Sequence, residues 1–287
     1  MSPQASDKLS LLRLGAMKRQ GEKIAMLTAY DAPSARLADQ AGVDLLLVGD
    51  SAAMVVLGHD STLPVTLDEM ILLTAAVART TRRALIVGDL PFGSYQESDE
   101  KAVASAVRLV KEGGADVVKL EGSGPRLSRA RAIVDAGIPV MGHIGLTPQS
   151  ATMLGGYKPQ GQTARSGGAL YASALALQAA GCCALVLEAV PAAVASKIAG
   201  ALTIPAIGIG AGAGCDGQVL VWHDLLGLSE DPVPRFVRRY ADLSSEIHRA
   251  LAAYVSDVRS GAYPEEKHTY PMSDDERARF DGLVRGQ

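Results

Sequence analysis

Short apolar runs rich in Val, Leu and Ile recur along the chain, and most intervals between runs leave room for one helix. Each run is almost continuously apolar, which is typical of strands buried on both faces of a parallel sheet. Most intervening segments repeat their apolar residues with a period near 3.6, which predicts helices. The predicted strands are Ile24–Thr28, Asp44–Gly49, Ala84–Gly88, Asp116–Leu120, Pro139–His143, Ala184–Glu188, Pro205–Gly208 and Gln218–Trp222. Eight strand–helix repeats predict an α/β fold, a (β/α)8 TIM barrel, with a doubly wound sheet as the alternative.

Several predicted helices carry start or stop signals. Thr66 and Glu69 form a capping box ahead of an apolar segment. The last predicted helix is the clearest, since its apolar residues step by three and four from Phe236 to Val258 and it stops at Gly261. This helix either closes the barrel wall or contacts another copy of the chain.

The chain shows no internal boundary, because no change in composition and no Pro- or Ser-rich linker divides it. We therefore expect an N-terminal segment over residues 1–23 and one catalytic barrel over residues 24–263. A polar C-terminal tail over residues 264–287 is expected to be loosely ordered.

Composition agrees with a parallel sheet, because only 4% of the residues are aromatic and the core must come from aliphatic side chains. The net charge of −3 excludes a strongly basic nucleic-acid surface. The longest apolar runs are far below the ~18 residues of a membrane span, and the N-terminus has no apolar signal region. We therefore expect a cytoplasmic protein. Its cysteines, Cys182, Cys183 and Cys215, lack zinc-site spacing and are predicted to be buried thiols of a reducing compartment.

Polar residues gather where the predicted strands end, which is where barrel enzymes place their chemistry. In chain order they are Asp50, Ser51, Asp89, Lys119, Glu121, His143 and Glu188. If the barrel forms, these side chains converge on one mouth. His143 alone is equally consistent with a hydrogen-bonded core histidine and with a pocket residue.

Three of these acids, Asp50, Asp89 and Glu121, follow successive strands and would repel one another in a shared pocket. A hard divalent cation relieves that repulsion, and Mg²⁺ typically takes one or two carboxylates and keeps several waters. The sequence therefore predicts a magnesium site rather than a zinc site, since no Cys or His cluster is present.

Lys119 lies within an apolar strand and needs a counter-charge there. It either pairs with Asp89 or Glu121, or holds the carboxylate of a substrate. Schiff-base chemistry is a weaker alternative, because nearby acids raise the pKa of a lysine and oppose its action as a nucleophile.

Two glycine-rich segments lie at the predicted mouth. The alternating glycines of 208–214 do not match the dinucleotide fingerprint GxGxxG, and close turning of the backbone is the favoured interpretation. The segment from Gly145 to Gln162 is a long loop rich in Gly and Pro, which predicts a flexible active-site loop.

Several longer motifs in this order resemble the ketopantoate hydroxymethyltransferase family. They are MLTAYD (26–31), LVGDSA (47–52), DLPFGSY (89–95), VKLEG (118–122), MGHIGLTPQ (141–149), LEAVP (187–191), and IGIGAG (207–212) with CDGQ (215–218). The match extends from about Ile24 to Tyr263, and so many motifs in register are far more specific than any short pattern.

The resemblance implies a (β/α)8 barrel of the phosphoenolpyruvate/pyruvate superfamily. The family transfers a hydroxymethyl group from 5,10-methylenetetrahydrofolate to 3-methyl-2-oxobutanoate, the first committed step toward pantothenate and coenzyme A. By resemblance, Asp50 and Asp89 bind Mg²⁺, with Glu121 close to the metal or bound through water. Asp50, Ser51, Asp89 and Lys119 bind the keto acid, and Glu188 is the general base. The family also implies a large homo-oligomer, typically a decamer.

Two alternatives remain at this point. One is a Mg²⁺-dependent lyase or mutase of the same superfamily that acts on another 2-oxo or 2-hydroxy acid. Such enzymes typically carry a Lys-Lys-Cys-Gly-His-type loop, which is absent here. The other alternative is a non-catalytic barrel, which should have lost some of the acidic residues at the strand ends.

Overall fold

Eight parallel strands close into a barrel in which each strand pairs with its neighbour in the chain and the last pairs with the first. The computed structural model describes residues 8–229 and 233–285. The strands are β1 Ile24–Thr28, β2 Leu45–Val48, β3 Leu85–Asp89, β4 Val117–Glu121, β5 Val140–Gly145, β6 Ala184–Glu188, β7 Ala206–Ile209 and β8 Gly217–Leu220. Each overlaps a strand predicted from the sequence. The predicted (β/α)8 barrel is therefore confirmed.

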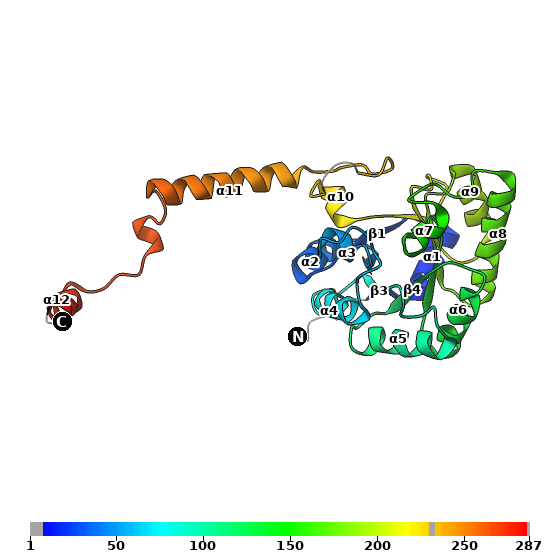
Figure 1. Cartoon of the computed structure of the whole chain (residues 1–287), viewed down its shortest axis with the longest axis horizontal. Helices are drawn as coiled ribbons and strands as arrows, with labels where there is room; N and C mark the ends of the chain where they lie inside the picture. Colours follow the sequence, from blue (N-terminus) through cyan, green and yellow to red (C-terminus); the bar gives the residue numbers. More distant parts are fainter. Residues whose placement is uncertain (1–7, 230–232, 286–287) are drawn as a thin grey trace. The chain divides into compact units, whose positions relative to one another are not determined.

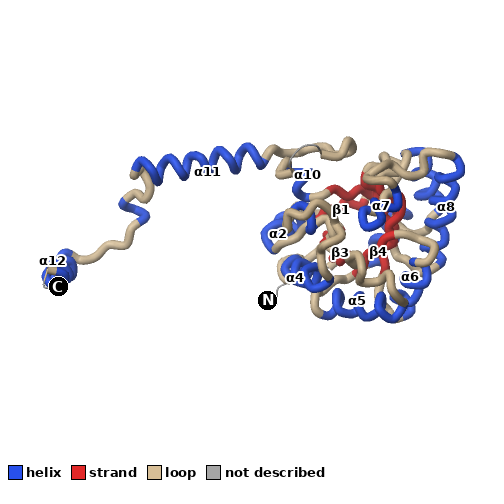
Figure 2. The backbone as a smooth tube through the Cα atoms, in the orientation of Figure 1, coloured by secondary structure: helices blue, strands red, loops and turns tan. Residues whose placement is uncertain are grey.

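Helices surround the strands (Figures 1 and 2). Those of the first 240 residues are α1 Leu11–Gln20, α2 Ala32–Gln40, α3 Ala52–Val55, α4 Leu67–Ala78, α5 Asp99–Lys111, α6 Arg126–Asp135, α7 Ala151–Leu154, α8 Ala164–Ala179, α9 Ala192–Ala201 and α10 Trp222–Leu226. The predicted capping box is present at the start of α4, where Thr66 accepts the amide of Glu69 and Glu69 accepts the amide of Thr66. In the described part of the chain, no helix is both long enough and apolar enough to cross a membrane.

Two apolar layers hold the barrel together. The outer layer packs the helices against the strands, and the inner layer fills the barrel with aliphatic side chains such as Met26, Leu45, Val87 and Val186. Leu14 and Met17 of α1 belong to the inner layer and are almost completely buried. The segment before β1 therefore packs into the barrel core. The polar groups lie elsewhere, at the carboxyl ends of the strands.

Aspartates at the amino ends of three strands fix how neighbouring strands align. Asp44, Asp116 and Asp216 directly precede β2, β4 and β8, and each accepts a backbone N–H of the preceding strand. The donors are the amides of Ala25, Ile86 and Ala206, at 3.0, 2.8 and 2.8 Å. Each aspartate is also paired with a cation, which offsets the cost of its partial burial. The sequence predicted that Asp44 and Asp116 are the first residues of strands. In the structure each lies just before its strand, and its side chain binds the backbone of the preceding strand.

The last long helix starts later than its periodicity predicts. α11 spans Leu243–Ser260, so the predicted start at Phe236 is wrong, while the stop at Gly261 is confirmed. Asp242 begins the helix because its side chain accepts the amide of Ser245. Before it, the amide of Tyr240 donates to the carbonyl of Leu225, which holds residues 233–240 beside α10 instead of in a helix.

Contacts divide the chain into two compact units, residues 1–240 and residues 241–287. The predicted domain range of 24–263 spans this boundary and includes α11, for which the sequence left two roles open. The second unit also contains the short helix η2 Glu266–His268 and the helix α12 Asp274–Val284. The segment expected to be loosely ordered thus includes a helix, which Ser273 caps and which Asp274, Asp275 and Glu276 favour through the helix dipole.

A methyl group added at Gly217 tests the closure of the barrel. A Cβ there would lie 2.4 Å from the carbonyl oxygen of Ile24 and 2.8 Å from Ile207, across both seams of β8. We expect Gly217→Ala to lower the free energy of unfolding by about 1–3 kcal/mol in urea denaturation. The matched control is Gly168→Ala in α8, where nothing lies within 4 Å and alanine should stabilise by up to about 1 kcal/mol. Equal effects of the two changes would contradict this account.

Candidate active site

A cavity of about 630 Å³ opens at the carboxyl ends of the strands. All seven residues singled out in the sequence line it: Asp50, Ser51, Asp89, Lys119, Glu121, His143 and Glu188. The structure therefore brings every predicted site residue together. They meet because the parallel strands of a barrel all end at the same face.

Strand alternation and register decide which of these side chains touch. Lys119 and Glu121 are two residues apart in β4, so both point to the same side of the sheet, into the barrel. The register pairs Asp89 with Lys119 and Glu121 with His143. Neighbouring strands thus place an acid beside a base twice.

The central contact is a buried ion pair in which Lys119 Nζ lies 2.8 Å from Asp89 Oδ2 and 3.9 Å from Glu121 Oε1. The backbone N–H of Asp50 also donates to Asp89 Oδ2, at 3.1 Å. Lys119 is therefore paired with acids, as one of its two predicted interpretations required. The three nearby carboxylates outweigh burial and raise the pKa of Lys119, which keeps the amine charged and opposes Schiff-base chemistry.

Asp50 and Asp89 are destabilised as carboxylates. Burial, followed by repulsion from Asp89 and Glu121, raises the pKa of Asp50 well above its ordinary value. Burial also raises the pKa of Asp89, and the positive charge of Lys119 offsets only part of that rise. A further positive charge in the cavity would therefore be stabilised by both groups.

His143 connects two acids across β5. Its Nδ1 lies 3.3 Å from Glu121 Oε1 and 3.4 Å from Lys119 Nζ, and its Nε2 lies 3.2 Å from Glu188 Oε2. Burial and the Lys119 charge lower the pKa of His143, but its contacts with Glu121 and Glu188 outweigh them and raise it to about 9. Of the two open interpretations, the structure supports the pocket residue, since His143 lines the cavity.

Glu188, the last residue of β6, is the least buried acid of the cluster, with a side chain 16% exposed against 2% for Glu121. Its position leaves the carboxylate open to a molecule in the cavity. Ser51 directly follows Asp50, and its hydroxyl shares a 2.8 Å hydrogen bond with the hydroxyl of Tyr30. Tyr30 thereby orients a hydroxyl toward the same cavity.

The donor set fits a hard divalent cation held by two carboxylates. Asp89 Oδ1 is buried and has no hydrogen-bond partner among the described residues. Asp50 is the neighbouring acid, since its backbone N–H donates to the other carboxylate oxygen of Asp89. Mg²⁺ needs no more than one or two carboxylates, because water and substrate complete its coordination. Within the described ranges, no group of three or more His, Cys, Asp or Glu side chains is arranged to hold one ion. Direct binding through Glu121 as a third ligand stays a prediction.

Sequence reasoning missed two buried residues that hold this cluster, Gln149 and Tyr95. Gln149 follows β5 in the 3-10 helix η1 Pro148–Ser150 and donates to Asp50 Oδ2 and, through its backbone, to Glu121 Oε2. Tyr95 donates to Gln149 Oε1 at 2.7 Å. Both residues end matched motifs, DLPFGSY and MGHIGLTPQ, and that position was the only signal available.

The predicted loop of residues 145–162, which lies between β5 and α8 and is called the β5–β6 segment, is attached at both ends near Glu188. The amide of Leu146 donates to the carbonyl of Glu188, and the amide of Gln160 donates to that of Ala189. Between these bonds lie η1 and α7, so the predicted loop contains short helices; its predicted flexibility stays a prediction. Gly145, at φ +99°, is required at the first attachment because a Cβ would lie 2.2 Å from the Glu188 oxygen.

The outer wall of the cavity is mostly apolar. Its residues come from the segment after β2, the β5–β6 segment and residues 233–236, and include Met54, Val55, Leu146, Pro148, Tyr157, Pro159, Val233, Pro234, Arg235 and Phe236. Phe236 lies against Gly210, where a Cβ would approach its ring to 2.5 Å. The alternating glycines therefore allow close packing at the mouth, as the sequence suggested.

The predicted buried thiols are confirmed only in part. Cys182 and Cys215 are buried, Cys183 is half-buried, and all three are free. Burial raises the pKa of Cys182 to about 12, so this sulfur is an unreactive thiol at neutral pH.

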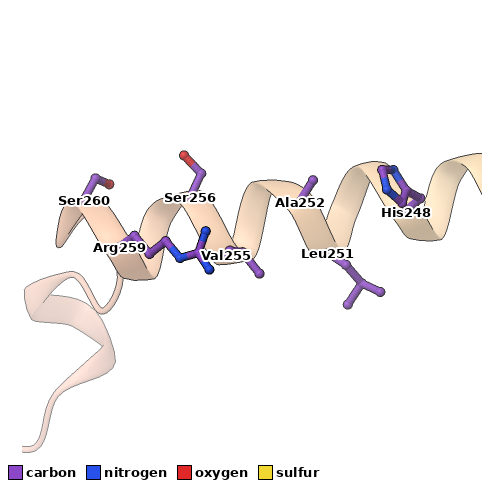
Figure 3. Close-up of a pocket in the computed structure, with 7 residues that line it drawn as sticks. All are labelled: His248, Leu251, Ala252, Val255, Ser256, Arg259 and Ser260. Atoms are coloured by element: carbon purple, nitrogen blue, oxygen red, sulfur yellow. The ribbon is translucent and has the colours of Figure 1, made fainter.

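A second hollow lies on α11 and carries no comparable chemistry (Figure 3). Its lining comes from one helix only: His248, Leu251, Ala252, Val255, Ser256, Arg259 and Ser260. These side chains are all exposed, and some of them are apolar. The cavity at the strand ends is therefore the candidate active site.

Comparisons with known proteins agree with this location. The family model of ketopantoate hydroxymethyltransferase matches residues 8–266. The 3-methyl-2-oxobutanoate hydroxymethyltransferase of Moorella thermoacetica is 56% identical over 263 residues, which cover 92% of this chain and 98% of that protein. The enzyme of the same name from Thermobifida fusca is 54% identical over 266 residues, which cover 93% and 95%.

Solved structures with the same fold include phosphonopyruvate hydrolase in complex with oxalate and Mg²⁺, with a TM-score of 0.60 and 12% identity over 96% of this chain and 95% of that one. A 2,3-dimethylmalate lyase, a member of the PEP mutase/isocitrate lyase superfamily, has a TM-score of 0.58 and 16% identity over 96% and 98%. At this identity the likeness concerns the fold alone. It agrees with the predicted (β/α)8 barrel.

The raised pKa of His143 predicts a pH dependence of stability. A group whose pKa rises from 6.5 to about 9 on folding stabilises fully below pH 6.5 and loses that contribution as the pH rises through 9. In chelator, we expect the difference in unfolding free energy between wild type and His143→Gln to shrink by up to about 3 kcal/mol from pH 6.5 to 9.5. Urea denaturation measures it, with exposed His59→Gln as control. Parallel pH profiles of wild type and His143→Gln would refute the assignment.

Proposed function

This chain belongs to the ketopantoate hydroxymethyltransferase family, and we propose that it transfers a hydroxymethyl group from 5,10-methylenetetrahydrofolate to 3-methyl-2-oxobutanoate with Mg²⁺ as cofactor. Membership makes it an enzyme, and relatives named for the same reaction at 53–56% identity support its place in pantothenate synthesis. The cytoplasmic location expected from the sequence stays a prediction.

The observation that carries the proposal is the charge of the cavity. The cavity is lined by five acids, Asp50, Asp89, Glu121, Glu188 and Asp224, and by three bases, Lys119, Arg235 and His143, of which His143 has a pKa raised to about 9. Two negative charges are left over in a buried site, which a single divalent cation would balance. Asp50 and Asp89 would hold Mg²⁺, which when bound would polarise the keto group of the substrate as a Lewis acid.

The cavity residues divide the remaining tasks. The ammonium group of Lys119 has three N–H donors, and Asp89 accepts one of them. The remaining donors and the hydroxyl of Ser51 are placed to bind the carboxylate of the keto acid. Glu188 takes the proton from C3 onto Oε1 or Oε2, since it is the acid most open to the cavity. His143 lies against the same carboxylate and orients it. The C3 carbon then forms a bond to the methylene carbon of the folate while the bond from that carbon to one folate nitrogen breaks. Water replaces the second folate nitrogen on that carbon, which releases the hydroxymethyl product and tetrahydrofolate.

The size and lining of the cavity support a second, larger substrate. About 630 Å³ is far more than a five-carbon keto acid needs, and the outer wall is apolar except for a few side chains such as Tyr157 and Arg235. A folate would lie against that wall, above the acids. No described contact favours the lyase or mutase alternative, and 145–162 has no cysteine.

Product formation and proton exchange test the proposal together. With both substrates and Mg²⁺, the purified protein should form ketopantoate, detected by mass spectrometry, and excess chelator should lower the rate at least ~100-fold. Glu188→Gln keeps the shape but removes the base, so exchange of the C3 proton of 3-methyl-2-oxobutanoate with deuterium should slow by about 10²–10⁴-fold.

The matched control is Glu97→Gln, an exposed glutamate outside the cavity, which should exchange at the wild-type rate. Wild-type exchange in Glu188→Gln would remove Glu188 as the base. Undiminished product formation in chelator would remove the metal.

We also propose that copies of the chain assemble into a large homo-oligomer, as the family resemblance implies. α11 carries an apolar stripe of Ile247, Leu251, Tyr254 and Val258, each 46–58% exposed, and none of its residues is buried. A stripe of this kind on an 18-residue helix is suited to contact with another subunit.

Light scattering after gel filtration checks the assembly. We expect a mass several times the 29.8 kDa of one chain, and a lower mass for Leu251→Glu, because a charge in the stripe opposes its burial. Ser256→Glu lies on the opposite face of α11 and should leave the mass unchanged. Wild-type protein at single-chain mass would contradict the proposal.

A further inference from the structure

We infer that Gln149 is a positioning residue that holds Asp50 as a metal ligand and fastens the β5–β6 segment to the acidic cluster, and that Tyr95 sets the direction of its amide. The metal part of this inference rests on the proposed function. The part that concerns the segment rests on the hydrogen bonds alone.

Every polar atom of the Gln149 side chain is used, although it is only 5% exposed. Nε2 donates to Asp50 Oδ2 and to the carbonyl of Leu90, both at 3.0 Å. Oε1 accepts the hydroxyl of Tyr95 at 2.7 Å and Nε2 of Gln96 at 3.3 Å. Two donated and two accepted bonds are all that one amide can make.

The direction of this amide is fixed by a backbone donor. The N–H of Glu121 donates to the Tyr95 oxygen at 3.1 Å, so Tyr95 accepts there and has one proton left to donate. Two acceptors lie near the Tyr95 hydroxyl: Gln149 Oε1 at 2.7 Å and the carbonyl oxygen of Glu121 at 3.4 Å. The hydroxyl proton therefore goes to the nearer acceptor, Gln149 Oε1. The NH₂ group must therefore face Asp50 and Leu90, since the carbonyl of Leu90 can only accept. The flipped amide would set oxygen against oxygen at both.

The backbone of Gln149 makes a second attachment, since its N–H donates to Glu121 Oε2 at 3.0 Å. One residue of the β5–β6 segment thus touches groups from the ends of β2, β3 and β4. A movement of this segment would therefore also change the orientation of the Asp50 and Glu121 side chains.

A neutral donor suits this place better than a charged one. Lys or Arg here would hold Asp50 more strongly but would also cancel the negative charge that attracts a cation. The amide restrains Oδ2 and leaves the charge of the carboxylate in place. Partners of ligating carboxylates commonly affect metal affinity by 10–100-fold.

Metal binding without substrate tests the first part. By calorimetric titration with Mg²⁺ alone, we expect Gln149→Met, which keeps the size but cannot donate, to bind at least ~10-fold more weakly than wild type. Tyr95→Phe removes only the hydroxyl that directs the amide and should weaken binding in the same direction. Gln160→Met is the matched control in the same segment, because among the described residues its side chain donates to the carbonyl of Lys158 alone.

Proteolysis in chelator tests the second part without any metal. Tyr157 is 53% exposed in the middle of the segment, and chymotrypsin should cleave after it several-fold faster in Gln149→Met than in wild type or Gln160→Met. Tyr95→Phe should be cleaved faster as well, which keeps the test valid if Gln149→Met folds poorly.

The outcomes separate the two proposals. Wild-type Mg²⁺ affinity in Gln149→Met and Tyr95→Phe would overturn the role toward the metal. Wild-type cleavage of both would overturn the attachment of the segment. A wild-type protein that binds no Mg²⁺ would contradict the proposed function, and the cleavage rates would then decide the inference by themselves.

Discussion

The ion pair of Lys119 and Asp89 makes the site possible, because it is what lets three acids be buried within reach of one another. A carboxylate without a partner is costly to bury, and removing one member of a buried pair costs several kcal/mol. Lys119 is only 4% exposed at its side chain and contacts Asp89 at 2.8 Å while facing Glu121 at 3.9 Å. His143, on the next strand, likewise lies against two acids, Glu121 and Glu188. The positive groups compensate the acids only in part, and the negative charge that remains would favour the binding of a cation.

The strand ends could be predicted from the sequence because β-structure imposes simple rules. Parallel strands of a barrel end at one face, so a polar residue after an apolar run must point to the mouth. Asp89, Lys119 and Glu188 follow from that rule alone, and the spacing of Lys119 and Glu121 places both inside. The contacts among these side chains could not be predicted in this way, because they depend on which strands pair and on the register of each pair. His143 shows the limit: its position predicted either of two roles, and only its distances to Glu121 and Glu188 favour one.

Other parts of the chain were beyond sequence reasoning for different reasons. Phe236 fits the apolar period of α11, yet it packs against Gly210 at the mouth, because the Asp242 cap starts the helix seven positions later. Periodicity cannot detect such a break when the preceding residues happen to keep the same spacing. Gln149 was missed because an amide in a loop has no pattern at all. Its importance comes from filling a three-dimensional gap between Tyr95, Leu90 and Asp50, which are distant in sequence.

The backbone around Glu188 links the reacting group to the same segment that Gln149 fastens. Ala189 has φ +49°, a left-handed conformation that costs a non-glycine residue about 1 kcal/mol. In that conformation its carbonyl accepts the amide of Gln160, its own amide donates to Ile209, and the carbonyl of Glu188 accepts the amide of Leu146. Three backbone bonds therefore depend on one strained residue. Both ends of the segment bind the dipeptide that carries Glu188, while Gln149 binds Asp50 and Glu121. The segment therefore connects the acid that would move the proton with Asp50, which would hold the metal. A displacement at either end changes the geometry at the other.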